Sequence, residues 1–124
     1  MLFKCKDGFV FREDKIHHIK ANKKGYALVY MTYEQEEPYT ITLSDYALLV
    51  AVLLKEYQNF YMTSNGDIFN LEDIMMMGFD SEQNEYYVYI FDYKYENSDI
   101  FFIISKKDYE EILKICKNLW TRSL

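Results

Sequence analysis

Two histidines and two cysteines are the side chains of this chain best suited to catalysis or metal binding. His17 and His18 are adjacent in a predicted strand, where successive side chains point to opposite faces, so their rings cannot hold one metal ion together. Cys5 and Cys116 have neither metal-ligand nor CxxC spacing, which indicates structural thiols in a reducing compartment. A cationic neighbourhood also opposes metal binding, and here it comprises Lys15, Lys20, Lys23 and Lys24. We therefore expect a solvated histidine pair and no metal site.

Other patterns of catalytic residues are missing from the sequence as well. The four glycines lie in predicted turns rather than in a phosphate-binding loop, and no serine lies in a nucleophile elbow. Adjacent carboxylates such as Glu72 and Asp73 lie in predicted loops, where acidic side chains are usually solvated. We expect no enzymatic activity and no cofactor.

The abundant residue types are suited to binding rather than to catalysis. Aromatic residues make up 19% of the chain, which is more than a core of this size needs. In segment 86–95, Val88 and Ile90 share one face of a predicted strand, which we match to Leu28 and Tyr30 earlier in the chain and expect to face the core. The opposite face carries Tyr87, Tyr89, Phe91, Tyr93 and Tyr95. Because tyrosine gives a large contact area at low entropic cost, this ladder predicts a partner-binding surface, with a sheet covered on both sides as the alternative.

Acidic residues are concentrated around the same segment. The formal net charge is −6, and residues 1–58 contain eight basic and eight acidic side chains, so the whole excess belongs to residues 59–124. The acidic residues that we predict to contact a partner are Asp80, Glu82, Glu85, Asp92, Glu96 and Asp99. The alternative is a surface that merely keeps the protein in solution.

Together, these features favour a small non-enzymatic protein that binds the basic surface of a protein partner. Phosphate neutralisation supplies most of the affinity in nucleic-acid complexes, so an acidic ladder argues against direct nucleic-acid binding. Acidic side chains along a strand could instead imitate the phosphates of a duplex. The hypothesis is an antitoxin-like or immunity-like inhibitor of a nucleic-acid-handling target, similar in size and charge to small acidic anti-defence proteins of phages and mobile elements. The alternatives are a small-ligand-binding protein with a tyrosine-lined pocket between two repeats, and a structural or assembly component.

An internal repeat organises the elements that position these residues. The segment GFVFREDKIHHI from Gly8 to Ile19 recurs 58 residues later as GDIFNLEDIMMM from Gly66 to Met77. Self-similarity of this length predicts a tandem duplication of one supersecondary unit, with repeats at 1–58 and 59–124 in a single domain. Each repeat begins with a hairpin at a glycine turn, continues with three strands and ends in a helix. The predicted class is α+β, with a mainly antiparallel sheet and two helices packed on it.

The two predicted helices differ in their pattern of apolar residues. The second, which begins near Ser105, is amphipathic, whereas the first is apolar on all sides from Tyr46 to Leu54 and must be covered on both sides. We expect the other repeat to cover it, and the alternative is a homodimer through Leu48, Ala51 and Val52. This apolar run is far shorter than the roughly 20 residues that a bilayer requires, and charged residues interrupt any N-terminal signal sequence. We therefore expect a cytoplasmic protein without membrane contact.

Overall fold

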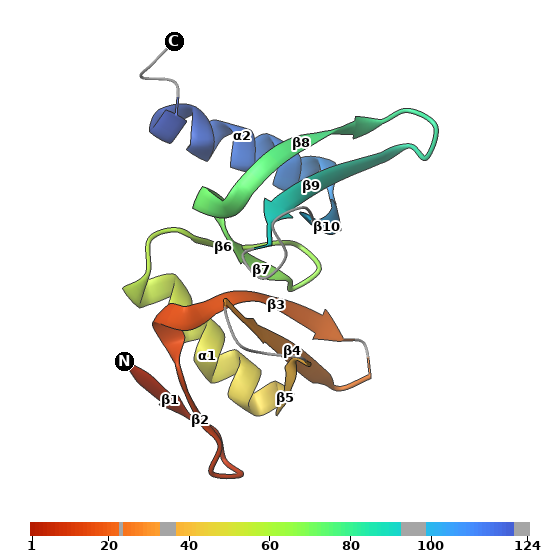
Figure 1. Ribbon diagram of the computed structural model, residues 1–124. Coiled ribbons are helices and arrows are strands. Elements are labelled where there is room, and N and C mark those ends of the chain that lie inside the picture. The colour runs from red at the N-terminus through yellow and green to blue at the C-terminus, as the bar shows by residue number, and fades with distance from the viewer. Residues whose placement is uncertain (23, 33–36, 93–98, 121–124) are drawn as a thin grey trace.

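The computed structural model describes residues 1–22, 24–32, 37–92 and 99–120 of the chain. Within these ranges, ten strands and two α-helices follow one another in an order that occurs twice (Figure 1). The first half comprises β1 (Leu2–Lys4), β2 (Val10–Arg12), β3 (Ile16–Asn22), β4 (Tyr26–Met31), β5 (Tyr39–Thr42) and α1 (Leu43–Glu56). The second half comprises β6 (Phe60–Met62), β7 (Ile68–Asn70), β8 (Ile74–Asp80), β9 (Glu85–Phe91), β10 (Asp99–Ile104) and α2 (Lys106–Trp120). The tandem duplication itself stays a prediction.

The strands form three antiparallel sheets, which confirms the predicted α+β class. The strands β1 and β2 form the smallest sheet, and β10, β9 and β8 form a three-stranded sheet in that order. The largest sheet has the order β5-β4-β3-β7-β6 and contains strands of both halves, because β7 pairs with β3. In this pairing His18 lies opposite Phe69 and Ile19 lies opposite Ile68. Main-chain hydrogen bonds thus join the two halves.

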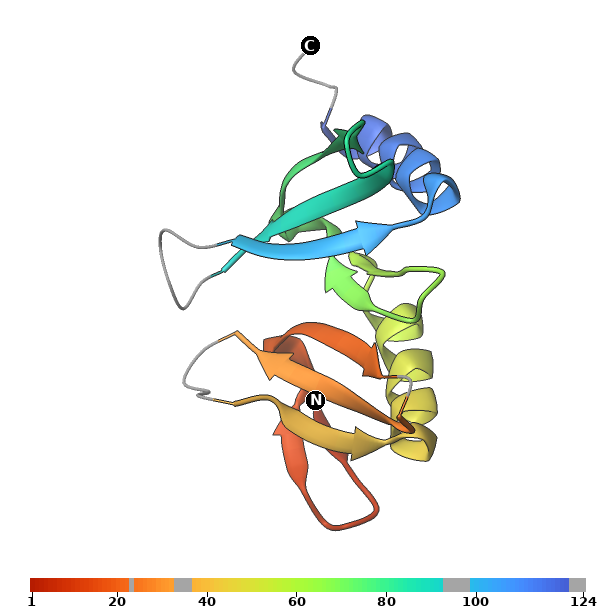
Figure 2. The ribbon, with the colours of Figure 1, turned by 90° about the vertical axis from the view of Figure 1, so that its right-hand side faces the viewer.

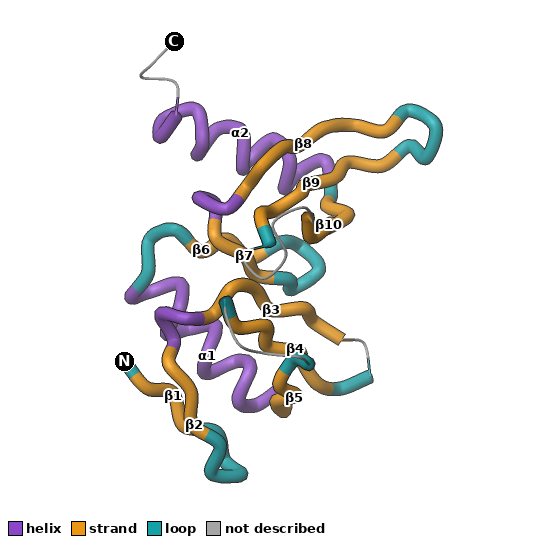
Figure 3. The backbone as a smooth tube through the Cα atoms, in the orientation of Figure 1, coloured by secondary structure: helices purple, strands orange, loops and turns teal. Residues whose placement is uncertain are grey.

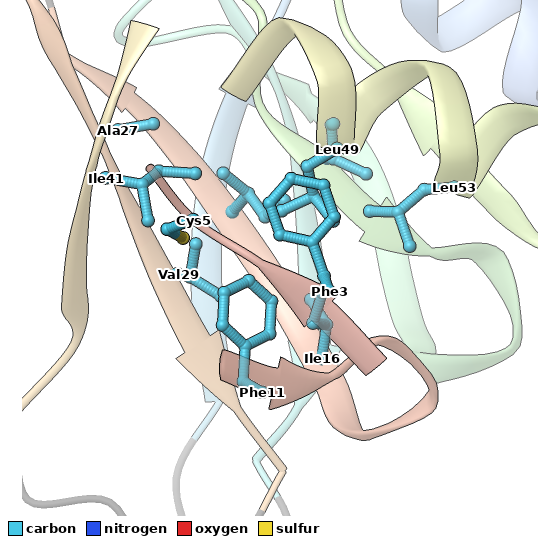
Figure 4. Packing of buried hydrophobic residues seen from close by; sticks show 11 residues of the cluster. Phe3, Cys5, Phe11, Ile16, Ala27, Val29, Ile41, Leu49 and Leu53 are labelled. Atoms are coloured by element: carbon cyan, nitrogen blue, oxygen red, sulfur yellow. The ribbon is translucent and has the colours of Figure 1, made fainter. Parts of the chain in front are cut away.

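Two hydrophobic cores meet at β7. The first core lies between the sheet of the first half and α1, and Figure 4 shows Leu49 and Leu53 of this helix projecting into it. The second core includes side chains of β9, β10 and α2. Because neighbouring side chains of a strand point to opposite faces, Ile68 belongs to the first core and Phe69 to the second. One three-residue strand therefore contributes to both cores.

The helix α1 is covered on one side only, which corrects the expectation that the other repeat buries its outer face. Leu49 and Leu53 are fully buried, but Leu48 is 57% exposed, Ala51 is exposed and Val52 is half-buried. No helix in the described ranges combines the length and apolarity that crossing a membrane requires.

Candidate functional site

The starts of both helices and the turns beside them lie along one side of the molecule. Figure 2 shows this side at the right, with the start of α1 low, the β6–β7 turn near the middle and the start of α2 above it. Figure 3 draws the turns as loop segments. In each half a hairpin turn donates a backbone hydrogen bond to the first turn of the helix, so this side is built twice in the same way.

Asp108 joins the hairpin turn of the second half to α2. Its carboxylate accepts hydrogen bonds from the Ser64 amide, the Tyr61 hydroxyl and the Ser105 hydroxyl, each at 2.9 Å. The Ser105 hydroxyl also accepts from the Asp108 amide at 3.0 Å and thereby caps the helix. Burial raises the pKa of Asp108, but hydrogen bonds from Ser64, Ser105 and Tyr61 outweigh it, and the pKa lies below its ordinary value. This carboxylate is therefore charged and satisfied within the chain.

Asp45 has the corresponding position in the first half, with longer hydrogen bonds. Both of its carboxylate oxygens accept from the Lys6 amide at 3.3 Å, and the Thr42 hydroxyl donates to it at 3.2 Å. Asp45 and Asp108 are each 3% exposed. The two acids nearest the helix starts are thus hidden from any ligand at this surface.

Four lysines belong to the elements of this side. Lys106 and Lys107 begin α2, Lys24 lies in the β3–β4 turn, and Lys20 lies near the end of β3. We call these four residues the lysine group. The Lys20 ammonium lies 5.3 Å from the centre of the Phe102 ring, a cation–π contact that holds it beside β10. Lys106 lies 4.0 Å from a carboxylate oxygen one helical turn later, in an exposed pair that restrains it little.

A shallow hollow of about 340 Å³ lies beside the lysine group. Lys20, Ala21, Asn65, Asp67, Phe101, Phe102 and Ile103 line it. Asp67 accepts a hydrogen bond from the Ala21 amide at 2.9 Å, and burial raises the pKa of Asp67 in spite of this bond. Beside the Asp67 carboxylate, the hollow therefore presents an ammonium, an amide side chain and aromatic surface, and these three groups can contact phosphates and bases.

The two histidines lie at the junction of the halves, so the expectation of a solvated pair is wrong. His17 is 4% exposed and His18 is 2% exposed. The pairing of β3 with β4 shifts in register between Ile16 and His18, which breaks the strict alternation of side chains. As a result the two Nδ1 atoms lie 2.9 Å apart, and His17 Nε2 lies 2.6 Å from the carbonyl oxygen of Phe91 in the second half. The pair connects the halves.

The His18 ring is held between aromatic side chains of both halves. It stacks on Tyr30 with ring centres 4.2 Å apart, and it meets the edge of Phe102 at 5.5 Å. Burial, with smaller contributions from His17 and Lys20, lowers the pKa of His18 to about 2. A neutral His18 packs the junction and takes no part in proton transfer near neutral pH. No three His, Cys, Asp or Glu side chains of the described residues are placed to hold a metal ion.

The predicted partner-binding residues lie on the face of the three-stranded sheet that points away from α2. Val88 and Ile90 are fully buried, whereas Tyr87 and Tyr89 are half-buried and Phe101 beside them is 42% exposed. In the first half, however, the core positions are Ala27 and Val29, so the match to Leu28 and Tyr30 is one residue out of register. A hollow of about 700 Å³ brings Tyr87 and Tyr89 together with Asp80, Glu82 and Glu85.

The other predicted contacts are placed less closely or not at all. Asp92 is half-buried just beyond β9. Asp99 begins β10, but its side chain lies outside the described part of the structure, as do Tyr93, Tyr95 and Glu96 entirely. The predicted tyrosine-lined pocket between the repeats is not found among the described hollows. The hollow of about 570 Å³ at the junction has Tyr57 as its one lining tyrosine, and the hollow beside the lysine group has none.

Comparison with known proteins gives a likeness in fold. Neither a family model nor a curated protein matches the sequence. Among solved structures, the chain is similar to one described as the "LytTr DNA-binding domain" of a response regulator from Bacillus cereus. The TM-score is 0.55 at 14% sequence identity, and the match covers 94% of each chain. The two chains share a fold over nearly their whole lengths.

This likeness contradicts the predicted function. An acidic inhibitor that binds a basic protein partner without direct nucleic-acid contact is not supported, because the fold is that of a domain described as DNA-binding. The sequence reasoning counted charge by segment and judged each basic cluster by itself. The lysines around Lys20 and Lys24 are too few by themselves to bind phosphates, whereas folding places Lys106 and Lys107 on the same side. The wide separation of these lysines in the sequence gave no local signal for the group.

Proposed function

We propose that this chain binds DNA. The observation that carries the proposal is the shared fold, over 94% of both chains, with a domain described as DNA-binding. We further propose that binding is its function in itself, without an enzymatic step, and that it acts in the cytoplasm.

The side that carries the helix starts is the best candidate for the DNA contact. It contains the lysine group, and the positive end of the α2 dipole lies between Ser105 and Lys107. Phosphate contacts of this kind fix a protein on the duplex, while base contacts supply specificity. Asn65 and Lys20, which line the adjacent hollow, are side chains that can donate hydrogen bonds to base edges.

The net charge of −6 sets limits on this interaction. The acidic hairpin at Asp80, Glu82 and Glu85 belongs to the β8–β9 end and repels phosphates, so binding must be confined to the lysine side. If all four lysines contact phosphates, the slope of log K against log salt is about −3.6, since each contact contributes about −0.9. Affinity would then fall about 150-fold as salt rises from about 50 to about 200 mM. We expect weak binding to random DNA and a clear salt dependence.

Fluorescence anisotropy with a labelled pool of random-sequence duplexes tests the proposal. The double variant Lys106→Gln/Lys107→Gln should bind more weakly and should reduce the salt slope by about 1.8, the contribution of two phosphate contacts. The matched control is Lys114→Gln/Lys117→Gln, which makes the same change of charge on the same helix, seven or more residues further on. The control should bind with nearly the wild-type slope.

Two results would count against this reasoning. Equal losses in the two double variants would leave DNA binding in place but exclude the lysine group as its site. Absence of binding at low salt, together with no enrichment after repeated selection from the same duplex pool, would refute DNA binding itself. Circular dichroism of each variant ensures that the comparison is between folded proteins.

A further inference from the structure

The edge of β3 shows how one half of this molecule accepts a strand of the other. Strand β7 adds to this edge, and Ile68 enters the first core from it. The core residues behind the edge are closed off from solvent as a result: Ile16 is 4% exposed, and Ile19 and Ala27 are fully buried. The junction is therefore a strand addition with a hydrophobic side chain inserted beneath it.

The corresponding edge in the second half is open. Strand β8 ends the three-stranded sheet and has β9 as its one partner within the described residues. It even repeats the register irregularity of β3, here between Ile74 and Met76. The residues at the positions of Ile16, Ile19 and Ala27 are Ile74, Met77 and Tyr86. All three are half-buried. The second core is thus incomplete at the place where β7 completes the first.

The strand that would complete this edge is present at the other end of the same chain. Strand β2 holds the position in the first half that β7 holds in the second, and among described strands it pairs with β1 alone. Its Phe11 is buried like Phe69, but Val10, the counterpart of fully buried Ile68, is 44% exposed. Within the described residues, each molecule therefore carries at β8 an edge equivalent to the one that β7 fills, and at β2 a strand suited to fill it.

We propose that copies of this chain associate head to tail, with β2 of one copy adding to the edge of β8 of the next. The register follows from the internal junction. His18 opposite Phe69 and Ile19 opposite Ile68 become Met76 opposite Phe11 and Met77 opposite Val10. This inference is independent of the proposed DNA binding, because it uses the opposite ends of the molecule and none of the lysine group.

A second contact of the internal junction has a counterpart in the proposed one. Phe102 of β10 covers His18 in the internal junction, with ring centres 5.5 Å apart. Tyr39 of β5 occupies the position of Phe102, because each lies opposite the core valine of the preceding strand. In the proposed assembly Tyr39, which is 37% exposed, covers Met76, which is 51% exposed. The same aromatic cover is therefore repeated between copies.

A symmetric dimer uses the same surface of both copies, whereas this association uses β2 of one copy and the β8 edge of the other. Each dimer therefore has a free β2 at one end and a free β8 edge at the other, so it can extend. Sedimentation velocity over a wide range of concentration should show dimers and then longer species. The variant Val10→Lys blocks strand β2, which adds to the next copy. The variant Met76→Lys blocks the edge of β8, which accepts β2. Because each places a charge where the junction excludes water, each variant alone should sediment as a monomer.

Mixing the two blocked variants provides the decisive measurement. Met76→Lys retains an intact β2 and Val10→Lys retains an intact β8 edge, so an equimolar mixture regains one working junction and should form one-to-one dimers that do not extend. A control variant, Leu48→Lys on the exposed face of α1, should associate like the wild type. Wild-type protein that stays monomeric at every concentration would overturn the proposal, and so would a mixture that shows no dimer. Loss of association in Leu48→Lys with retention in both other variants would place the interface on α1 and would likewise refute it.

Discussion

The stability of this protein should fall between pH 7 and pH 5 because of His18. Its folded-state pKa of about 2 lies below the ordinary value of 6.5, so in this range the unfolded chain takes up a proton that the folded chain refuses. The stability linked to His18 is therefore complete above about pH 6.5 and is lost as the pH falls toward the folded-state pKa. At about pH 5 the loss from this one group is about 2 kcal/mol, from 1.5 pH units at about 1.4 kcal/mol each.

Urea denaturation of the wild type and of His18→Gln at a series of pH values measures this contribution. Glutamine does not titrate and can still hydrogen-bond to His17, so the variant should be less stable than the wild type at pH 7 but should lose about 2 kcal/mol less on going to about pH 5. The chain has two histidines, so their imidazole signals can be followed separately by NMR. The His18 signal should not titrate while the protein remains folded.

Two outcomes would contradict the buried position of His18. One is an equal loss of stability in the wild type and in His18→Gln between the two pH values, and the other is titration of His18 near 6.5 in the folded protein. In either case the 2.9 Å contact between the two histidines and the stacking on Tyr30 would have to be abandoned with it.

Two further predictions concern the elements that hold the lysine side together. Asp108→Ala removes the carboxylate that accepts from the Tyr61 hydroxyl and the Ser64 amide, and it should cost about 3 kcal/mol. Asp45→Ala, which removes longer hydrogen bonds, should cost about half as much in the same urea titration, and a larger loss for Asp45→Ala would contradict the comparison. Gly66 has φ of +86°, and a methyl group added there would lie 3.1 Å from the Tyr46 hydroxyl oxygen, while Gly8 has φ of +94° with open space around it. Both alanine substitutions should therefore lower the melting temperature, and Gly66→Ala should lower it more; equal shifts would show that the close approach to Tyr46 has no cost.

Much of the fold could be predicted from the sequence because its local signals agree with one another. The turns at Gly8, Gly25 and Gly66, strand alternation and the serine before α2 each indicate the observed element, whereas Gly78, also expected in a turn, lies within β8. Val88 and Ile90 lie in the core as their alternation predicts. The amphipathic pattern of α2 likewise identifies Ile112 and Cys116 as buried. These features depend on residues close together in the chain.

The rest depends on how the halves pack, which no local pattern encodes. The histidines lie among lysines in the sequence, yet a one-residue irregularity in β3 turns both rings toward the second half. The same packing brings Lys20 beside Phe102, which lies more than eighty positions later in the chain. Charge counted along the sequence does not show these placements, and the likeness in fold contradicts the basic protein partner that this count indicated.

The position of β7 also affects the order in which the chain can fold. Synthesis releases the first half before residues 68–70 have appeared, and until then the first core lacks Ile68 and the edge of β3 has no strand beside it. An unpaired edge of this kind readily pairs with other chains. The first half is therefore exposed to misassembly throughout the time that the ribosome needs to extend from α1 to β7, and rapid formation of the β6–β7 hairpin, rather than of either helix, ends that period.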